Sequence, residues 1–259
     1  MTASANAARA ANPRRISTTA LVILAAWLAA GGALAVYDPL RGLLTFVFVL
    51  LGWLLSVMAH EFGHAYVGYL GGDHTVASKG YLTLDPARYI NSATSLVIPL
   101  IVVAIGGIGL PGGAVYLRQD LMRSRAWRSA SSLAGPAATA AVLVVLSVCI
   151  ALARAFTPST ALPAALAFLA FLQATALVIN LLPVPGLDGY GALRPYLPGA
   201  LTKRIRRWEN LLFMGFVLLL LTSSGANDEL FKTAISISDI IGVPRDWVVM
   251  GYEAFRFWH

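Results

Sequence analysis

Long apolar runs, separated by short polar or basic stretches, dominate the chain. The runs cover residues 21–36, 42–70, 129–153, 164–182 and, more briefly, 211–221. A helix that crosses the hydrocarbon core of a bilayer needs about 20 mostly apolar residues, and it satisfies its own backbone groups. The pattern therefore predicts an all-α, polytopic transmembrane helical bundle with about five to six spans.

One apolar stretch, near residues 92–113, is poorly suited to a regular span. It contains two prolines, and five glycines lie between positions 106 and 113. Irregular backbone is tolerated at membrane depth where it is buried in protein or lines a cavity. We predict a re-entrant or interfacial segment here. The polar stretch before it contains a strand-like sequence at residues 80–84.

The two ends of the chain carry less regular patterns. The N-terminal tail, residues 1–17, is polar and rich in alanine, and the apolar run after it is longer than a signal-peptide core, which predicts an uncleaved first helix. The C-terminal tail, residues 223–259, mixes apolar and charged residues and is predicted to lie along the membrane interface. We treat residues 1–259 as a single integral membrane domain with its core at residues 42–194.

Composition supports a membrane protein. Of the 259 residues, 58% are hydrophobic and 12% are charged, and the mean hydropathy is +0.73; soluble domains carry roughly twice that share of charge. The net charge of +7 could suggest nucleic acid, but zinc-finger, helix-turn-helix and RNA-recognition signatures are absent. We expect the lipid bilayer as a partner and no nucleic acid. The lone Cys149 cannot form an intrachain disulfide.

The basic residues predict a topology. If residues 95–110 crossed the membrane, the 19 Lys and Arg residues would divide nine against ten. If that segment re-enters instead, fourteen lie on one side and five on the other. Basic residues accumulate in cytoplasmic loops, which favours the second arrangement. We predict a multi-pass protein of the cell membrane whose active site lies toward the cytoplasmic face.

His60, Glu61 and His64 form the pattern H-E-x-x-H within an apolar run. Histidines four residues apart on a helix project from one face, one turn apart, so both imidazoles can bind one zinc ion. The glutamate can then take a proton from water that the zinc activates. Three polar groups in an apolar helix are costly unless they pair or bind something. The pattern predicts a metal site.

A catalytic zinc site usually has three protein ligands, so a third remains to be found. The longer pattern with a further histidine is absent, because position 70 is Leu70. His74 is reachable only if the chain folds back after its helix. Asp188 directly follows an apolar run that Pro183-Val184-Pro185-Gly186 interrupts. From the residues alone, Asp188 is either a ligand or a loop cap.

Several segments together form a more specific pattern. They are His60-Glu61-Phe62-Gly63-His64-Ala65, Leu82-Thr83-Leu84-Asp85-Pro86, Ala134-Gly135-Pro136 and Asn180-Leu181-Leu182-Pro183-Val184-Pro185-Gly186-Leu187-Asp188-Gly189. In this order they resemble the signatures of the site-2 proteases, a family of intramembrane zinc metalloproteases, over residues 43–194. Two departures are Gly186, where a second proline is frequent, and Ala138-Thr139, which replaces Ala-Asn. The chain is similar to small bacterial members, because no stretch is long enough for a PDZ or CBS domain.

The resemblance implies roles for the matching residues. His60, His64 and Asp188 would bind one Zn2+ per chain, Glu61 would be the catalytic base, and Asn180 would contact the substrate or the oxyanion. The implied activity is hydrolysis of peptide bonds in transmembrane or membrane-proximal segments of a membrane-spanning protein substrate. Such a helix must unwind locally before it is cut, because its carbonyls are engaged in backbone hydrogen bonds.

Two other classes of function compete with a protease. A transporter or channel would also carry intramembrane charges and broken helices, although it would not need a glutamate directly after the first of two metal-spaced histidines. A catalytically inactive membrane scaffold of the same fold would be expected to have lost a ligand or Glu61. The sequence does not specify an oligomeric state.

Overall fold

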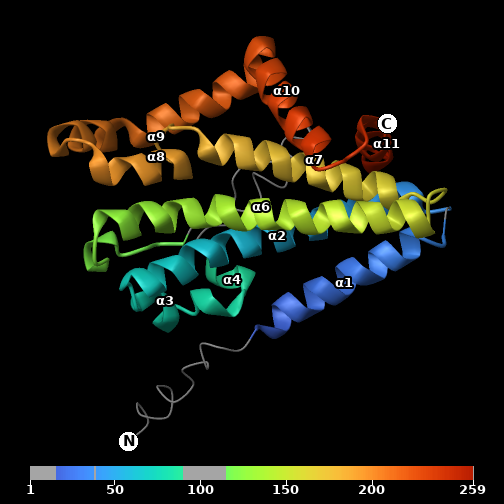
Figure 1. Cartoon of the computed structure of the whole chain (residues 1–259), viewed down its shortest axis with the longest axis horizontal. Helices are drawn as coiled ribbons and strands as arrows, with labels where there is room; N and C mark the ends of the chain where they lie inside the picture. The colour runs from blue at the N-terminus through green and yellow to red at the C-terminus, as the bar shows by residue number, and fades with distance from the viewer. Residues whose placement is uncertain (1–15, 38, 90–114, 259) are drawn as a thin grey trace, which may run out of the picture.

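The computed structural model describes residues 16–37, 39–89 and 115–258 as a bundle of helices (Figure 1). The elements are α1 Thr18–Leu34, α2 Arg41–Gly71, α3 Thr75–Ser78, η2 Tyr81–Thr83, α4 Pro86–Tyr89, η3 Gln119–Leu121, α6 Arg125–Phe156, α7 Leu162–Leu181, α8 Asp188–Leu193, η4 Arg194–Tyr196, α9 Gly199–Thr222, α10 Ser224–Ile240 and α11 Arg245–Phe255. Over these residues the predicted all-α bundle is confirmed.

Three of the described helices, α2, α6 and α7, are long and apolar enough to cross a membrane by themselves. A fourth candidate span is α9 together with α10, which meet at a bend of 87°. Helix α1 is apolar but has only 17 residues, the lower end of the spanning range. The total of five to six spans stays a prediction.

Helices α2 and α6 are antiparallel neighbours that meet at one end of the molecule (Figure 1). The amide of Arg123, just before α6, donates to the carbonyl oxygen of Gly71, the last residue of α2, at 2.9 Å. Gly72 then takes a left-handed conformation, with φ of 119°, which ends α2 as its sequence predicts. The chain between α2 and α6 therefore leaves and returns at the same end.

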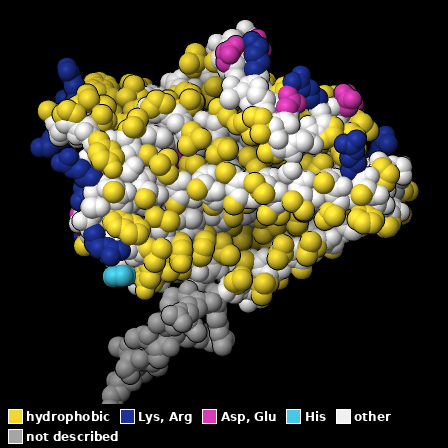
Figure 2. Space-filling model, in the orientation of Figure 1, with side chains coloured by type: hydrophobic (Ala, Val, Ile, Leu, Met, Phe, Trp, Pro, Cys, Tyr) yellow, Lys and Arg dark blue, Asp and Glu magenta, His cyan; other side chains and the backbone are white. Residues whose placement is uncertain are grey.

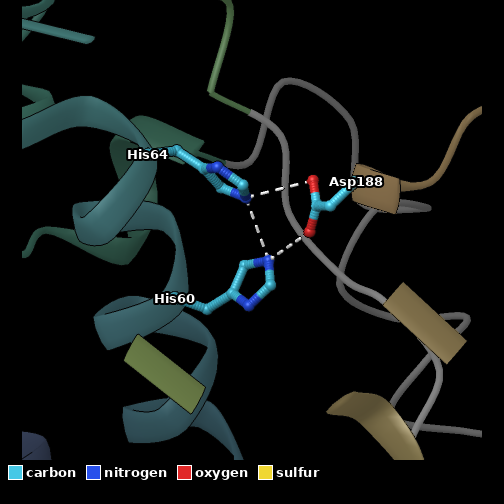
Figure 3. A group of neighbouring side chains, drawn as sticks. All are labelled: His60, His64 and Asp188. Carbon is cyan, nitrogen blue, oxygen red and sulfur yellow. Dashed lines mark hydrogen bonds and ion pairs between the residues drawn. The ribbon is translucent and has the colours of Figure 1, made fainter. Parts of the chain in front are cut away.

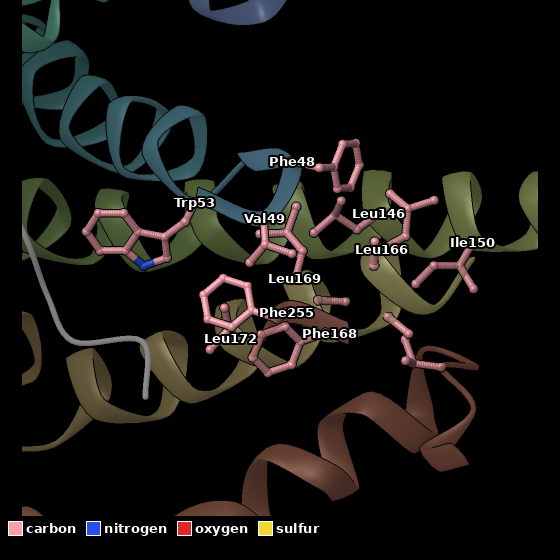
Figure 4. Close-up of a cluster of buried hydrophobic side chains, with 14 of the residues drawn as sticks. Phe48, Val49, Trp53, Leu146, Ile150, Leu166, Phe168, Leu169, Leu172 and Phe255 are labelled. Carbon is pink, nitrogen blue, oxygen red and sulfur yellow. The ribbon is translucent and has the colours of Figure 1, made fainter. Parts of the chain in front are cut away.

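A core of large apolar side chains holds α2, α6 and α7 together (Figure 4). Phe48 and Trp53 of α2, Leu146 of α6 and Leu169 of α7 are almost fully buried in it. Helix α7 is the most enclosed of the three, because 72% of its most apolar 18-residue stretch is buried. This packing fixes the depth and rotation of α2 against α7, the two helices whose ends carry the candidate site.

Many side chains on the outer surface of the bundle are also apolar. On α6, the exposed side chains include Val144, Val145, Val148 and Leu152, which follow one another at helical spacing. Figure 2 shows hydrophobic side chains spread over the long face of the molecule, with charged ones on its left side and along its upper right edge. An apolar belt of this extent is suited to contact with lipid rather than water.

The tail after residue 223 forms helices α10 and α11, which pack back onto the bundle. Helix α11 lies against α7 and α2, and Phe255 is fully buried in the core. Helix α10 also packs against α7. The expected interfacial position of this tail stays a prediction, but its packing shows that it is part of the folded core.

One local prediction was wrong, and another falls outside the described residues. The strand-like sequence at residues 80–84 instead contains the 3-10 turn Tyr81–Thr83, flanked by left-handed Gly80 and Leu84. The Thr83 amide donates to the Gly80 carbonyl oxygen at 3.2 Å, and no neighbouring strand pairs with this segment over the described residues. The re-entrant segment near residues 92–113 lies outside the described residues, as does the N-terminal tail before residue 16.

Candidate active site

The H-E-x-x-H residues lie on α2, in the half that leads to its C-terminal end. His60 and His64 are one turn apart on the same face, and their ring centroids are 4.7 Å apart. Glu61 and His64 are buried, and His60 is partly buried. The helix therefore presents two imidazoles and a carboxylate to the interior of the bundle.

Asp188 reaches the same place through a sharp break in the chain. Helix α7 ends at Leu181, and Gly186 takes a left-handed conformation with φ of 96° before α8 begins at Asp188. Proline cannot adopt that angle and other L-residues rarely do, so this conformation of the chain favours glycine at position 186. Gly189 follows, and a Cβ there would meet the carbonyl oxygen of Leu182 at 2.5 Å. The break thus turns Asp188 toward α2.

The three side chains form a compact group (Figure 3). His60 Nε2 is 3.1 Å from Asp188 Oδ2, His64 Nε2 is 3.3 Å from Asp188 Oδ1, and the two Nε2 atoms are 3.0 Å apart. One ligand atom from each residue lies within 4.8 Å of the others.

The hydrogen bond made by Nδ1 of His64 determines which of its ring nitrogens is free to face Asp188. His64 Nδ1 is 2.7 Å from the carbonyl oxygen of Ser131, which can only accept, so Nδ1 carries the proton. In a neutral His64 ring, Nε2 then carries no proton, and its lone pair points toward Oδ1 of Asp188. The other carboxylate oxygen, Oδ2, is buried without a hydrogen bond. With both rings neutral these acceptors repel one another unless a cation lies between them, and two imidazoles with one carboxylate suit zinc.

Helix α6 approaches the group closely through two glycine contacts. A Cβ on Gly135 would lie 2.6 Å from His60 Nε2 and closer still to His64 Nε2. A Cβ on Gly63 of α2 would meet the carbonyl oxygen of Ala134. Side chains at these positions would push the helices apart or fill the space between the ligands. This explains in physical terms the glycine of the Ala134-Gly135-Pro136 segment.

Glu61 lies beside the group in a cavity of about 1090 Å³. The cavity is also lined by His60, His64, Asp188 and Asn180. The backbone amide of Val115 donates to Glu61 Oε2 at 2.9 Å. Glu61 is thus oriented by the chain that precedes α6, and it stands where it can exchange protons with a molecule in the cavity.

Comparison with known proteins identifies the family. The chain is 43% identical over 244 residues to "Putative zinc metalloprotease Rip2" of Mycolicibacterium smegmatis, covering 92% of each chain. It is 44% identical over 236 residues to the protein of the same name from Mycobacterium tuberculosis H37Rv, covering 89% of this chain and 90% of that one. The chain belongs to the site-2 protease family.

A more distant relative supports the same placement. "Putative zinc metalloprotease YwhC" of Bacillus subtilis is 26% identical over 185 residues, covering 69% of this chain and 82% of that protein. No family model matches the chain, and no solved structure matches it. This site-2 protease is accordingly a zinc metalloprotease of the membrane, with Zn2+ as its cofactor.

The other residues named from the sequence divide into two groups. Asn180 lines the cavity of this site-2 protease and is buried, with its Nδ2 donating to the Ala176 carbonyl oxygen at 3.0 Å. His74 does not join the metal-ligating group, because its ring packs edge-on against Tyr69, with centroids 4.8 Å apart. Although the chain turns at Gly72, the turn does not bring His74 back to the histidines of α2.

Three contacts that hold the site together were not predicted. They are the Ser131 carbonyl on His64, the Thr139 hydroxyl 2.9 Å from His60 Nδ1, and the Val115 amide on Glu61. Thr139 carried a signal, since it departs from the family's Ala-Asn pattern one turn beyond Gly135. The other two contacts use backbone atoms, which no residue pattern marks.

Proposed function

We propose that this zinc metalloprotease cuts peptide bonds within the membrane, in transmembrane or membrane-proximal segments of protein substrates. The observation that carries the proposal is the His60, His64 and Asp188 group with Glu61 beside it, set between helices of spanning length. A peptide bond must reach this group to be cut, and the surrounding helices would be embedded in lipid. The site would thus act on chains that are themselves in or next to the bilayer.

His60, His64 and Asp188 would be the three zinc ligands. Their inward-facing nitrogens and oxygens form the donor set described above, and Ser131 and Thr139 hold the two rings in place. Zinc bound by three protein ligands keeps an open position, where it activates water and polarises a carbonyl. Asp188, which could have been only a loop cap, is supported as a ligand by its position opposite both imidazoles.

Glu61 would handle the protons. Its carboxylate would accept a proton from the attacking water and then deliver it to the amine that leaves. Asn180 would contact the substrate or stabilise the oxyanion, since its amide nitrogen has a second N–H beyond the one given to Ala176. The substrate would have to unwind around the cut bond, because helical carbonyls are already hydrogen-bonded. Helix-breaking residues near the cut are therefore expected.

The cell membrane is the proposed location, with the active site toward the cytoplasm. The ends of α2 and α7 that carry the ligands lie at the same end of the molecule as the start of α6 (Figure 1). The basic stretch from Arg118 to Arg128 and the basic start of α9 belong to this end. Cytoplasmic loops accumulate such residues, which supports the orientation.

The competing functions lack a supporting observation. A transporter would use intramembrane charges along a path for its substrate, whereas these charges converge on one metal-ligating group. An inactive scaffold would have no need of the buried Glu61, which costs free energy to keep in an apolar helix.

The test is cleavage of a transmembrane model substrate by purified protein in vesicles, with zinc measured in the same samples. Glu61→Gln should lower turnover by at least about 10²-fold, the low end for an acid–base catalyst, and keep its zinc. His60→Ala and Asp188→Ala should lose zinc, whereas His74→Ala should keep both zinc and activity. Asn180→Ala should keep zinc and turn over more slowly.

Each outcome has a clear meaning. Cleavage by Glu61→Gln at the native rate would contradict the proton-transfer role. Full zinc in Asp188→Ala would remove it from the ligand set. Native turnover in Asn180→Ala would reduce that residue to a packing role.

A further inference from the structure

The cavity that contains the zinc-site residues also reaches a group of arginines. Its lining includes Arg125 and Arg128 on α6, Arg194 on η4 and Arg206 on α9. They come from three separate elements that meet at one end of the bundle. Figure 2 shows Lys and Arg side chains gathered at that end, on the left of the view. We refer to these four residues as the arginine mouth.

The arginine mouth concentrates positive charge that no ion pair offsets within the described residues. Within the described residues, none of its four members forms an ion pair, and Arg128 Nε is buried without a hydrogen-bond partner. Of the two acids that line the same part of the cavity, Asp120 is engaged at 2.7 Å by Arg118. Among the described lining residues outside the zinc-site group, Asp120, which also lies near Arg128, and Glu209 are the two carboxylates set against four guanidinium groups.

We propose that the arginine mouth binds acidic residues of the substrate. This protease would then prefer substrates with Asp or Glu in the segment that adjoins the cut bond and lies against these arginines. The inference rests on the proposed function and specifies its substrate class. Guanidinium groups bind carboxylates through paired, charge-assisted hydrogen bonds, and several that converge from different elements select for a cluster of carboxylates.

A peptide fits the position of these arginines better than a lipid headgroup does. The arginines line the same cavity as Glu61 and Asp188, so whatever they bind shares that cavity with the bond being cut. The chain on either side of that bond must pass through the cavity. A phospholipid headgroup, in contrast, would be held at the outer surface between protein and bilayer.

Membrane topology alone would also place basic residues at this end. A role in membrane topology needs only the positive charge of these residues and does not depend on whether their side chains line the cavity. Arg204 provides a matched control, because it is exposed on α9 like Arg206 but does not line the cavity. If only topology matters, charge reversal at the two positions should have equal effects.

The experiment uses the full chain in vesicles of uncharged phosphatidylcholine. The probes are two synthetic transmembrane peptides that differ only in one flank, which is rich in Asp and Glu or in Lys and Arg. Binding is measured with Glu61→Gln protein and cleavage with the native protein. The acidic-flank peptide should bind about tenfold more tightly and be cleaved with a higher kcat/KM, and the preference should weaken as salt is added.

Charge reversal then tests the residues. Arg194→Glu with Arg206→Glu should abolish or invert the binding preference, while Arg204→Glu should leave it unchanged. Equal binding of the two peptides in uncharged vesicles, or equal effects of Arg206→Glu and Arg204→Glu, would overturn the proposal. Equal binding of the two peptides together with binding of an anionic phospholipid that Arg206→Glu abolishes would overturn it in favour of a headgroup site. A binding preference with no cleavage of either peptide would support the arginine mouth and count against the proposed proteolysis.

Discussion

At the scale of single residues, Gly135 occupies space that the metal site needs. A Cβ there would meet Nε2 of both His60 and His64, the two atoms proposed to face zinc. Gly135→Ala should therefore lower zinc affinity by about 10- to 100-fold, the usual effect of disturbing the support of metal ligands. It should also destabilise the metal-free fold, because the buried rings of His60 and His64 must shift to admit the methyl group, and this outweighs the helix preference of alanine over glycine.

The measurement is zinc competition against a chelator, together with thermal unfolding of the metal-free protein. Gly215→Ala on α9 is the matched control, because a Cβ there meets nothing within 4 Å. Unchanged zinc affinity in Gly135→Ala would show that the helices relax enough to admit a methyl group.

At the scale of elements, Asp73 joins the end of α2 to the chain that precedes α6. It is fully buried, and its Oδ1 accepts from the Thr75 amide and hydroxyl while Oδ2 accepts from the Arg118 amide at 2.6 Å. This holds the segment from Val115 to Arg118, whose first amide donates to Glu61. Asp73 is thus placed to position the carboxylate of Glu61, the proposed proton-transfer group, through that segment.

Asp73→Asn should weaken this connection, because one accepting oxygen is replaced by an amide group that donates. We expect a loss of about 1–3 kcal/mol in the free energy of unfolding, typical for buried donors left without a partner. Cleavage should fall while zinc stays bound, and the Val115 and Arg118 amides should exchange faster with deuterium. Asp246→Asn on α11 is the control, because Asp246 is exposed and does not line the cavity, and it should change none of these. Native exchange rates in Asp73→Asn would exclude the positioning role.

Sequence patterns predicted the helices better than their contacts. The cores of α2, α6 and α7 could be read from hydropathy, because a spanning helix satisfies its backbone without help from other segments. The turn at Tyr81–Thr83 was misread as a strand, since strand formation depends on a partner that the local sequence does not reveal. The docking of α11 against α7 was also missed, because it depends on packing between distant segments.

In the candidate site, too, local features were predictable from the sequence and contacts between distant segments were not. His60, Glu61 and His64 lie within one helical turn, so their spacing alone predicts that they meet. Asp188 is distant in the sequence, and only the family resemblance favoured it over a loop cap before its position was known. The arginine mouth depends on three elements meeting at one end, which no local pattern encodes.

At the scale of the whole molecule, the orientation in the membrane can be tested directly. In a Cys149→Ala background, single cysteines at positions 79 and 120 should be shielded from an impermeant thiol reagent in intact cells and labelled after lysis. Both positions are exposed, as is Arg154 at the far end of α6, where a cysteine should be labelled from outside. These results are expected if the fourteen basic residues face the cytoplasm. Labelling of position 79 or 120 in intact cells would contradict this orientation.

The group formed by His60, His64 and Asp188 has a mechanical consequence as well as a chemical one. It joins the C-terminal half of α2 to the start of α8, so a bound ion would link two helices that could otherwise separate. A ligand whose free concentration is 100 times its dissociation constant stabilises a fold by about 2.7 kcal/mol. Removing zinc with a chelator should therefore lower the unfolding temperature and make the Leu182–Leu187 connection more sensitive to proteases, and restoring zinc should reverse both. Loading with metal would then govern how readily the bundle opens, before any substrate arrives.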